Sequence, residues 1–376
     1  MKNIKYIGFY DFNKNEKENR NYFLSAVNKM NYIAMTIDRE VDIISPSWTY
    51  NNKFYRGKSI HIDKNINLKL SPTIPWGNKL FKILSILFSN LWLFFYLLIN
   101  TQSGEEIIVY HSLWLAYPIY ILKRVKNIKL ILEVEEIYSD VSRQNILLKK
   151  IEKMIIENSD KYIFSTELLN HKLNKNNKPY SIIYGTYQIE KDRKETFQDN
   201  RIHVVYAGTL DPRKGGATAA AAAAQYLDEN YHIHILGFGS DQQKEELLVL
   251  IKEVSKITRC RITYDGLLNG EEYIRFLQKC HIGLSTQTPN AQYNDTSFPS
   301  KVLSYMSNGL RVVSIRIKAL EVSAIGKLLY YYDIDEAMEI ANKIKSINLN
   351  DNYDSREEIE KLNNEFEKNL KRLLER

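Results

Sequence analysis

Short apolar runs alternate with longer amphipathic or polar segments along the whole chain. In the first half these runs are KNIKYIGFY, VDIISP, EIIVYHS, IKLILEVEE and KYIFST. The segment after the first run predicts a helix over residues 22–35, because its apolar positions recur at helical spacing. Strands that alternate with helices indicate an α/β protein with parallel sheets.

The same alternation restarts after residues 194–201, a polar segment without periodicity. The later apolar runs are RIHVVYAGTL, YHIHILGFG, RITYDG, HIGLST and RVVSIR. Two doubly wound domains suit this pattern, and they also suit a length of 376 residues. We therefore predict an N-terminal domain over 1–193 and a C-terminal domain over 194–349, both Rossmann-like and facing a cleft.

Two further helices are predicted outside this alternation. The charged tail, 350–376, carries apolar residues three and four apart, which predicts an amphipathic helix that packs back across the first domain. These apolar positions are Ile359, Leu362, Phe366, Leu370 and Leu373. Residues 80–100 are almost wholly apolar, so we expect a buried helix or one that dips into a membrane surface; a true span is the alternative.

The net charge of +7 belongs to the first half of the chain. Residues 1–189 hold 26 Lys+Arg and 17 Asp+Glu, whereas residues 190–376 hold 26 and 28. The excess favours contact with anionic lipid or an anionic acceptor, or else it reflects solvated lysines. No helix-turn-helix, zinc-finger or RNA-binding motif accompanies it, so a nucleic acid partner is not expected.

The cysteine content and the N-terminus bear on the cellular compartment. Cys260 and Cys280 are too few for a disulfide framework or a four-cysteine zinc site. The start, MKNIKYIGFYDF, has no apolar core of a signal peptide. We expect a cytoplasmic protein, peripheral at the inner face of the cell membrane.

The segment VVYAGTLDPRKGG, residues 204–216, carries the most informative chemistry. A strand ends at Gly208-Thr209, and Arg213-Lys214 then precede two glycines that open a helix. Backbone N–H groups and the helix dipole favour an anion at such a helix start. With two cations beside it, at the carboxyl ends of strands, the segment predicts a diphosphate site; a solvated glycine turn is the alternative.

Three later segments each place glycine or a helix start after a strand. In ILGFGS, Gly237 opens a tight turn that lets a base or ribose approach the backbone, and the incomplete GxGxxG pattern disfavours a dinucleotide-binding dehydrogenase. In YDGLLNGEEY, Gly266 and Leu267 end a strand. In SFPSKVLSYMSNGLRVVS, Ser300 and Lys301 begin a helix after a proline.

These four segments, in this order, resemble the nucleotide-sugar-binding domain of GT-B glycosyltransferases, in particular glycosyltransferase family 4. The resemblance implies a GT-B fold, with Arg213 and Lys214 on the donor diphosphate and Gly208 and Thr209 shaping the loop. It also implies that the backbone near Gly266 and Leu267 meets the base.

The chain departs from the family pattern at two positions. The family usually has two glutamates eight residues apart, and Thr296 and Ser304 occupy those positions here. Ser297, Ser300 and Lys301 are the nearby candidates for contacts to the ribose, sugar or phosphate.

The N-terminal half is expected to hold the acceptor. His111 ends the strand EEIIVYHS, where the resemblance implies a place beside the donor sugar; a satisfied strand-end histidine is the alternative. Glu135 follows the next strand, where a carboxylate could serve as a base, with a surface carboxylate as the alternative. Asp11 and Asn13 lie in the loop after the first strand and are candidate acceptor contacts.

The sequence therefore predicts a glycosyltransferase that moves a hexose-type unit from a UDP- or GDP-linked sugar to a glycan or an undecaprenyl-type lipid-linked acceptor. The resemblance implies retention of anomeric configuration. The basic first half and the apolar segment 80–100 fit a role in capsule or exopolysaccharide assembly. No Asp-x-Asp metal motif is present, so neither metal nor cofactor is expected. The alternatives are an inverting GT-B transferase, or a degenerate subunit that stabilises a partner transferase.

Overall fold

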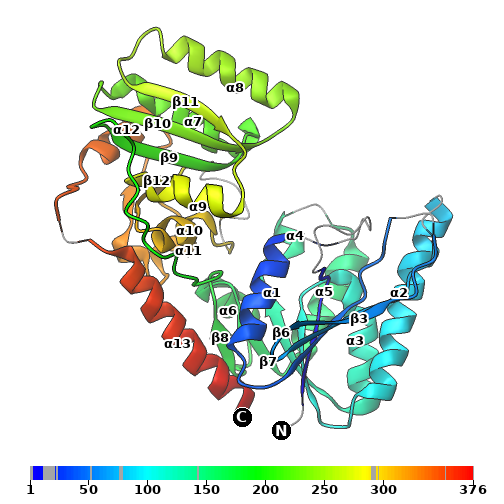
Figure 1. Cartoon of the computed structure of the whole chain (residues 1–376). Coiled ribbons are helices and arrows are strands. Elements are labelled where there is room, and N and C mark those ends of the chain that lie inside the picture. Colours follow the sequence, from blue (N-terminus) through cyan, green and yellow to red (C-terminus); the bar gives the residue numbers. More distant parts are fainter. Residues whose placement is uncertain are drawn as a thin grey trace. The chain divides into compact units, whose positions relative to one another are not determined.

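The structure is a computed structural model that describes residues 3–11, 22, 24–50, 53–75, 79–141, 144–288, 294, 296–351 and 353–375. The chain divides into two compact units, Met1–Thr186 with Phe366–Arg376, and Tyr187–Glu365. Each unit is built on one sheet flanked by helices (Figure 1). The sequence had placed the boundary between the two at 193/194.

The first unit contains an eight-stranded sheet in the order β3-β4-β2-β1-β5-β6-β7-β8. Its strands are β1 (Ile4–Ile7), β2 (Val41–Ser45), β3 (Lys58–Asp63), β4 (Ile66–Leu70), β5 (Glu106–Tyr110), β6 (Lys129–Val134), β7 (Lys161–Phe164) and β8 (Tyr180–Ile182). Its helices are α1 (Leu24–Thr36), α2 (Lys79–Asn100), α3 (Leu113–Lys126), α4 (Tyr138–Val141), α5 (Ile146–Asn158) and α6 (Glu167–Leu173).

All neighbouring strands of this sheet are parallel except β3 and β4, which form an antiparallel hairpin at the edge. The central strands read as continuous apolar runs because helices cover the sheet on both faces; every residue of β7 is buried. The strand order reverses at β1, whose neighbours are β2 and β5. In open α/β sheets, ligands bind at the carboxyl ends of the strands at such a point.

The second unit contains a six-stranded parallel sheet in the order β11-β10-β9-β12-β13-β14. Its strands are β9 (Ile202–Thr209), β10 (Tyr231–Phe238), β11 (Arg261–Gly266), β12 (Ile282–Ser285), β13 (Arg311–Ile315) and β14 (Tyr330–Tyr332). Its helices are α7 (Gly216–Ala223), α8 (Asp241–Val254), α9 (Gly270–Gln278), α10 (Lys301–Ser307), α11 (Lys318–Glu321) and α12 (Ala337–Lys345), with short 3-10 turns η1 (Pro212–Lys214), η2 (Ala224–Tyr226) and η4 (Gly326–Leu328).

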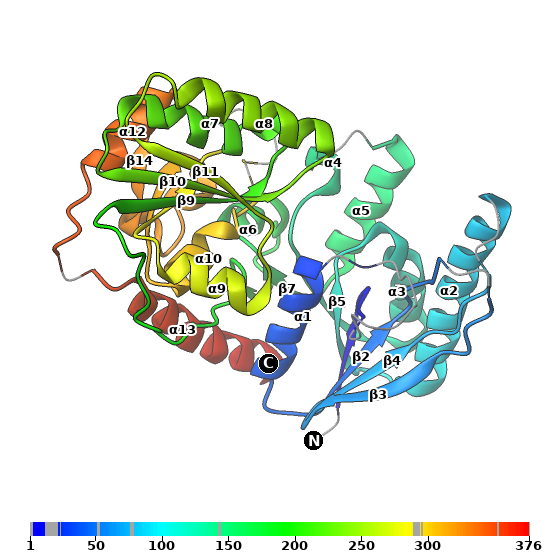
Figure 2. The ribbon, with the colours of Figure 1, turned by 45° about the horizontal axis from the view of Figure 1, so that its top comes forward.

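This strand order is that of a Rossmann sheet, and it reverses at β9, between β10 and β12. Figure 2 shows the parallel strands β9, β10 and β11 with α7 and α8 beside them. The prediction of an α/β chain with two parallel sheets is confirmed.

α2 has two unlike faces. Its buried face includes Leu93 and Leu97, each fully covered, and Ser89, whose hydroxyl donates to the carbonyl of Pro46 at 2.9 Å. The opposite face remains exposed although it is apolar, and 28% of the apolar window Leu80–Asn100 is buried. This is the one helix in the described part of the chain that is long and apolar enough to cross a membrane.

The last helix, α13 (Ser355–Glu375), begins in the second unit and ends in the first. The five apolar positions predicted from its spacing are all buried, which confirms the amphipathic helix. In its final turns Phe366 stacks on Tyr32, with ring centroids 6.1 Å apart, and the Lys161 amine donates to the Leu373 carbonyl at 2.6 Å. The end of the chain is therefore part of the core of the first unit.

Candidate functional site

A pocket of about 270 Å³ lies in the second unit, at the point where its strand order reverses. β9 and β12 pair only at their starts, Ile282 with Val204 and Gly283 with Val205, and then separate. The Tyr305 hydroxyl bridges the separated strands: it accepts from the Ala207 amide at 2.8 Å and donates to the Leu284 carbonyl at 3.3 Å. The pocket opens beyond this bridge.

The residues that line this pocket come from four segments. They are Tyr206, Gly208, Thr209, Lys214, Thr286, Gln287, Asn294, Ser297, Phe298, Pro299, Ser300 and Lys301. The structure thus brings together six of the residues predicted to contact the donor, from the end of β9, from η1 and from the start of α10.

Lys301 is the lysine of the pocket whose pKa is shifted by its surroundings. Its Nζ lies 4.1 Å from the centroid of the Tyr206 ring, and a Cβ at position 208 would approach that Nζ to 3.1 Å, so Gly208 leaves room for it. Burial, with a smaller contribution from Lys214, lowers the pKa of Lys301 from 10.5 to about 7. Two lysines that line one pocket favour a multiply charged anion as its ligand.

Of the two predicted cations of the turn, only Lys214 lines the pocket. Asp211 caps η1, and its carboxylate takes both the amide and the guanidinium of Arg213, with the closest pair at 2.6 Å. These hydrogen bonds hold the pKa of Asp211 at about 2, and the Arg213 side chain is 85% exposed. Arg213 therefore lies outside the pocket lining and is paired with Asp211, and its contact with the diphosphate stays a prediction.

The serines before α10 offer hydrogen bonds to a ligand. The Ser297 hydroxyl is buried and has no partner among the described residues, an arrangement that is costly unless a ligand or water pairs it. Ser300 precedes α10 and makes no capping bond with its side chain. Of the two positions that replace the family's glutamates, Thr296 is buried, and the Ser304 hydroxyl lies 3.2 Å from that of Tyr273.

The other donor residues predicted from the sequence lie at the same edge of the sheet but outside the pocket lining. Gly237, the penultimate residue of β10, has φ of +148°, and a Cβ there would lie 1.7 Å from the Gly208 carbonyl oxygen. Because it has no side chain, Gly237 lets β10 run close to Gly208 at the end of β9. Gly266 ends β11 with φ of +81° and open space around it, and Leu267 is exposed.

In the first unit, His111 follows β5 and Asp11 follows β1, the two strands at the reversal point of that sheet. The His111 ring is buried, and burial lowers its pKa to about 4, so it is neutral at pH 7. Its Nε2 has no hydrogen bond within the described residues and lies 3.8 Å from Glu152 Oε1. Asn13, the other predicted acceptor contact, lies outside the described residues.

The carboxylates at the end of β6 are paired or buried, although the sequence predicts one of them as a base open to the acceptor. Glu135, the predicted base, is paired with the Lys29 amine, which also donates to the Ile183 carbonyl at 2.9 Å. Glu133 is fully buried against the Tyr6 hydroxyl, and burial raises its pKa to about 8. The sequence places Glu133 with Glu135 and Glu136 among the carboxylates that could orient an acceptor hydroxyl or serve as a base; its position inside an apolar run, LILEV, is in addition a signal of a buried carboxyl group.

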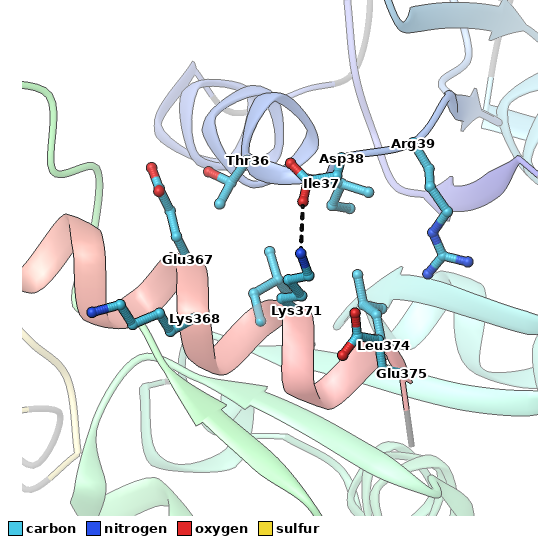
Figure 3. A pocket seen from close by; sticks show the side chains of 10 residues that line it. Thr36, Ile37, Asp38, Arg39, Glu367, Lys368, Lys371, Leu374 and Glu375 are labelled. Carbon is cyan, nitrogen blue, oxygen red and sulfur yellow. Dashed lines mark ion pairs between the residues drawn. The ribbon is translucent and has the colours of Figure 1, made fainter. Parts of the chain in front are cut away.

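A larger groove of about 540 Å³ lies in the first unit between the end of α1 and the final turns of α13 (Figure 3). Its walls carry exposed charges of both signs, including an ion pair of Lys371 with Asp38 at 3.6 Å. These charges neutralise one another, and none of the predicted site residues lies there. We therefore take the smaller pocket as the candidate site.

A family model described as "Glycosyl transferases group 1" matches residues 201–350, which contain the whole pocket. No curated protein sequence matches the chain.

Solved structures match over the full length. An E. coli trehalose-6-phosphate structure bound with UDP-2-fluoro glucose has a TM-score of 0.68 at 10% identity and covers 100% of this chain and 98% of its own. HepE of Anabaena in complex with UDP has a TM-score of 0.63 at 12% identity, with 100% and 99% covered. Sucrose-phosphate synthase of Thermosynechococcus elongatus has a TM-score of 0.63 at 13% identity, with 99% and 95% covered.

At such identities the structures show a common fold, and the family model adds the class of the second unit. The position of the pocket, where the strand order of the second sheet reverses, is consistent with that fold and with the family model. The chain therefore has the GT-B fold of these structures, and residues 201–350 of its second unit match the model described as "Glycosyl transferases group 1".

Proposed function

We propose that the protein transfers a sugar from a nucleoside diphosphate sugar, with UDP as the first candidate nucleotide, to a saccharide acceptor carried on an undecaprenyl-type lipid. The observation that carries this proposal is the pocket of the second unit, where Lys214, Lys301 and the unpaired Ser297 hydroxyl converge. Two structures with this fold contain UDP or a UDP-linked sugar, which supports the choice of nucleotide.

The chemistry follows from charge. When the bond between the sugar and the diphosphate breaks, the diphosphate gains negative charge, and cations already in place lower the energy of that state. We assign this role to Lys214 and Lys301, with no metal ion required. The resemblance to family 4 favours front-face transfer with retention, and the serines before α10 take over contacts that the two absent glutamates make in that family.

We assign the acceptor side of the reaction to the first unit. His111, neutral and with one unpaired ring nitrogen, follows one central strand, and Asp11 follows the neighbouring one. His111→Ala should lower turnover while leaving the affinity for UDP nearly unchanged, measured by steady-state kinetics and calorimetry. A large loss of UDP affinity would move His111 to the donor side.

The donor site is tested by titrating the purified chain with UDP in a calorimeter. Lys214→Ala should weaken binding about 10–100-fold, since a charge-assisted hydrogen bond is worth about 1.5–3 kcal/mol. Lys252→Ala, on the exposed side of α8, is the matched control and should bind as the wild type does. An unchanged affinity in Lys214→Ala would falsify the assignment of this pocket to the diphosphate.

We further propose that the first unit rests on an anionic membrane through α2, α3 and α5. α2 packs on α3, and α3 packs on α5. The exposed apolar side chains recur at spacings of three and four along α2 and α3, so each helix presents one apolar stripe. They are Leu80, Leu84, Leu87, Leu91, Phe95 and Ile99 on α2, and Trp114, Tyr117, Ile121 and Val125 on α3.

Charge complementarity supports lipid as the occupant of this apolar surface. Arg124 on α3 and Lys149, Lys150 and Lys153 on α5 are exposed, and each cation near an anionic bilayer contributes about 1 kcal/mol. α2 keeps a buried face in the core of the unit, so it would lie in the interface rather than span the bilayer. A cytoplasmic enzyme held in this way would reach a lipid-linked acceptor, as capsule or exopolysaccharide assembly requires.

Vesicle co-sedimentation tests this contact. Each of Leu87, Leu91 and Phe95 is a little over half exposed, so burying the exposed part is worth about 1 kcal/mol. The triple change to Gln should therefore lower partitioning into vesicles with anionic lipid by about 100-fold. Leu248→Gln with Val249→Gln, exposed on α8, is the control, and equal partitioning of all three proteins would refute the contact.

The absence of the family's two glutamates favours one alternative function. Thr296 is buried and Ser304 faces Tyr273, so neither position offers a carboxylate to the donor. A degenerate subunit that stabilises an active partner would bind UDP without transferring sugar. Sugar transfer by the purified chain alone excludes that function, and the anomer of the product, read by NMR, separates a retaining from an inverting enzyme.

A further inference from the structure

Three histidines of the second unit lie together at the amino-terminal ends of its strands. His203 is on β9, and His232 and His234 are on β10, where the pairing register sets His232 beside His203. We call these three residues the histidine cluster. All three are buried, with exposed fractions of 2%, 5% and 2%, and one ring nitrogen from each lies within 4.8 Å of the others.

Each histidine of the cluster has one ring nitrogen within hydrogen-bond distance of a residue outside the cluster. His203 Nε2 lies 2.7 Å from Asp199 Oδ1, and His234 Nδ1 lies 3.1 Å from Asp265 Oδ2. A carboxylate only accepts hydrogen bonds, so each of these two ring nitrogens carries a proton.

Thr263 fixes the third ring in the same way. Its hydroxyl donates to Asp265 Oδ2 at 2.8 Å, so it accepts from His232 Nε2, which lies 3.0 Å away. The proton of a neutral His232 is then on Nε2, and its Nδ1 carries a lone pair.

The inner nitrogens of His203 and His234 are thereby left without a proton between them. His203 Nδ1 and His234 Nε2 are 2.9 Å apart, yet in neutral rings both present lone pairs. Two facing lone pairs repel unless a cation lies between or beside them. An acidic partner on the far nitrogen of each ring is also the arrangement by which proteins orient metal-binding histidines.

We propose that the histidine cluster binds a divalent transition-metal ion, with Zn²⁺ as the first candidate, through His203 Nδ1, His234 Nε2 and His232 Nδ1. Three imidazoles and one open position form a common Zn²⁺ environment. The carboxylates of Asp199 and Asp265 balance the two charges of the ion.

The geometry needs only small adjustments for this role. Tetrahedral Zn²⁺ with Zn–N bonds of about 2.1 Å separates its ligand nitrogens by about 3.4 Å, so the rings of His203 and His234 would move apart by about half an ångström. The His232 ring, whose centroid lies 3.7 Å from that of His234, would rotate about its side-chain bonds to direct Nδ1 at the ion.

Two phenylalanine rings also pack against the cluster, and it lies apart from the donor pocket. Phe197 stacks on His203 and His234, with centroids 4.0 and 5.0 Å away, and Phe276 meets His234 edge-on at 5.0 Å. His281 uses its Nδ1 to accept from the His203 amide, so it is not a ligand candidate. The stretch of β9 from His203 to Thr209 is about 20 Å long, so the metal would brace the sheet rather than touch the donor.

The test uses the full chain without an affinity tag, stripped with a chelator and titrated with ZnCl₂ and CoCl₂. We expect one ion per chain and the strong visible absorption of Co²⁺ in a non-octahedral site. Free Zn²⁺ at 100 times its dissociation constant should raise the unfolding midpoint by about 5–10 °C.

Variants locate the ion. His203→Asn and His234→Gln should each lose the Co²⁺ absorption and the thermal shift, whereas His171→Asn, an exposed histidine of α6, should keep both. If the cluster variants do not fold, the absorption spectrum of wild-type Co²⁺ protein decides. An octahedral spectrum, no stoichiometric binding, or retention of the shift in a folded His234→Gln protein overturns the proposal and leaves a proton shared between His203 and His234.

Discussion

The pKa of Lys301 makes the affinity for UDP depend on pH in a range where the nucleotide itself no longer titrates. Burial lowers this pKa to about 7, so in the free protein at pH 8 the amine is mostly neutral. A diphosphate beside the amine stabilises its charged form and raises the pKa. Binding above pH 7 therefore takes up a proton.

The size of the effect follows from the protonated fraction. With a free pKa of about 7, about half of the Lys301 amines are charged at pH 7 and about one tenth at pH 8. If only the charged form binds the diphosphate, UDP affinity falls about fivefold over this unit and approaches tenfold per unit above it. The second ionisation of the terminal phosphate, near pH 6, is already complete.

Calorimetry in two buffers of different ionisation enthalpy measures the proton uptake on binding and the affinity for UDP in the same experiment. We expect uptake of close to one proton per UDP at pH 8, and a flat affinity profile between pH 7 and 8.5 in Lys301→Met. Lys252→Met should keep the wild-type slope, because its amine is exposed on α8. Zero proton uptake in the wild type, or an equal slope in Lys301→Met, would refute the reasoning.

Urea denaturation should give three further results. Gly237→Ala should lower the free energy of unfolding by about 3 kcal/mol or more, because its Cβ would clash with the Gly208 carbonyl. Gly104→Ala, where a Cβ meets open space, should lower it by about 1 kcal/mol. Equal decreases in the two variants would contradict the clash. Burial holds the pKa of His111 near 4, so stability should fall from pH 6.5 to 4 by up to about 3 kcal/mol, and less in His111→Gln. Burial raises the pKa of Glu133 to about 8, so stability should fall from pH 4.5 to 8, and Glu133→Gln should reduce that fall.

The pocket of the second unit could be assembled from the sequence because parallel strands end at one edge. Gly208 and Thr209 end one strand and Lys301 follows another, so the rule for open α/β sheets places them together although some ninety residues separate them. The difference between Arg213 and Lys214 could not be predicted. It depends on the Asp211 side chain, which caps the 3-10 turn and holds the arginine.

The histidine cluster shows the opposite case. The alternation in YHIHIL puts His232 and His234 on one face of a strand, and that signal is present in the sequence. The third member, His203, joins them only through the register of β9 against β10, which periodicity does not fix. Likewise, the burial that raises the pKa of Glu133 comes from tertiary packing, which also sets it against the Tyr6 hydroxyl, 127 residues away.

The shared helix α13 affects the order in which the protein can fold during synthesis. The core of the first unit includes Phe366, Leu370 and Leu373, which the ribosome adds only after the whole second unit. At about 5–20 residues per second, translation of residues 187–365 delays their arrival by roughly 10–40 s. During that interval the N-terminal unit exposes the apolar surface that the final turns of α13 later cover. It is therefore the half of the nascent chain that most needs chaperone protection.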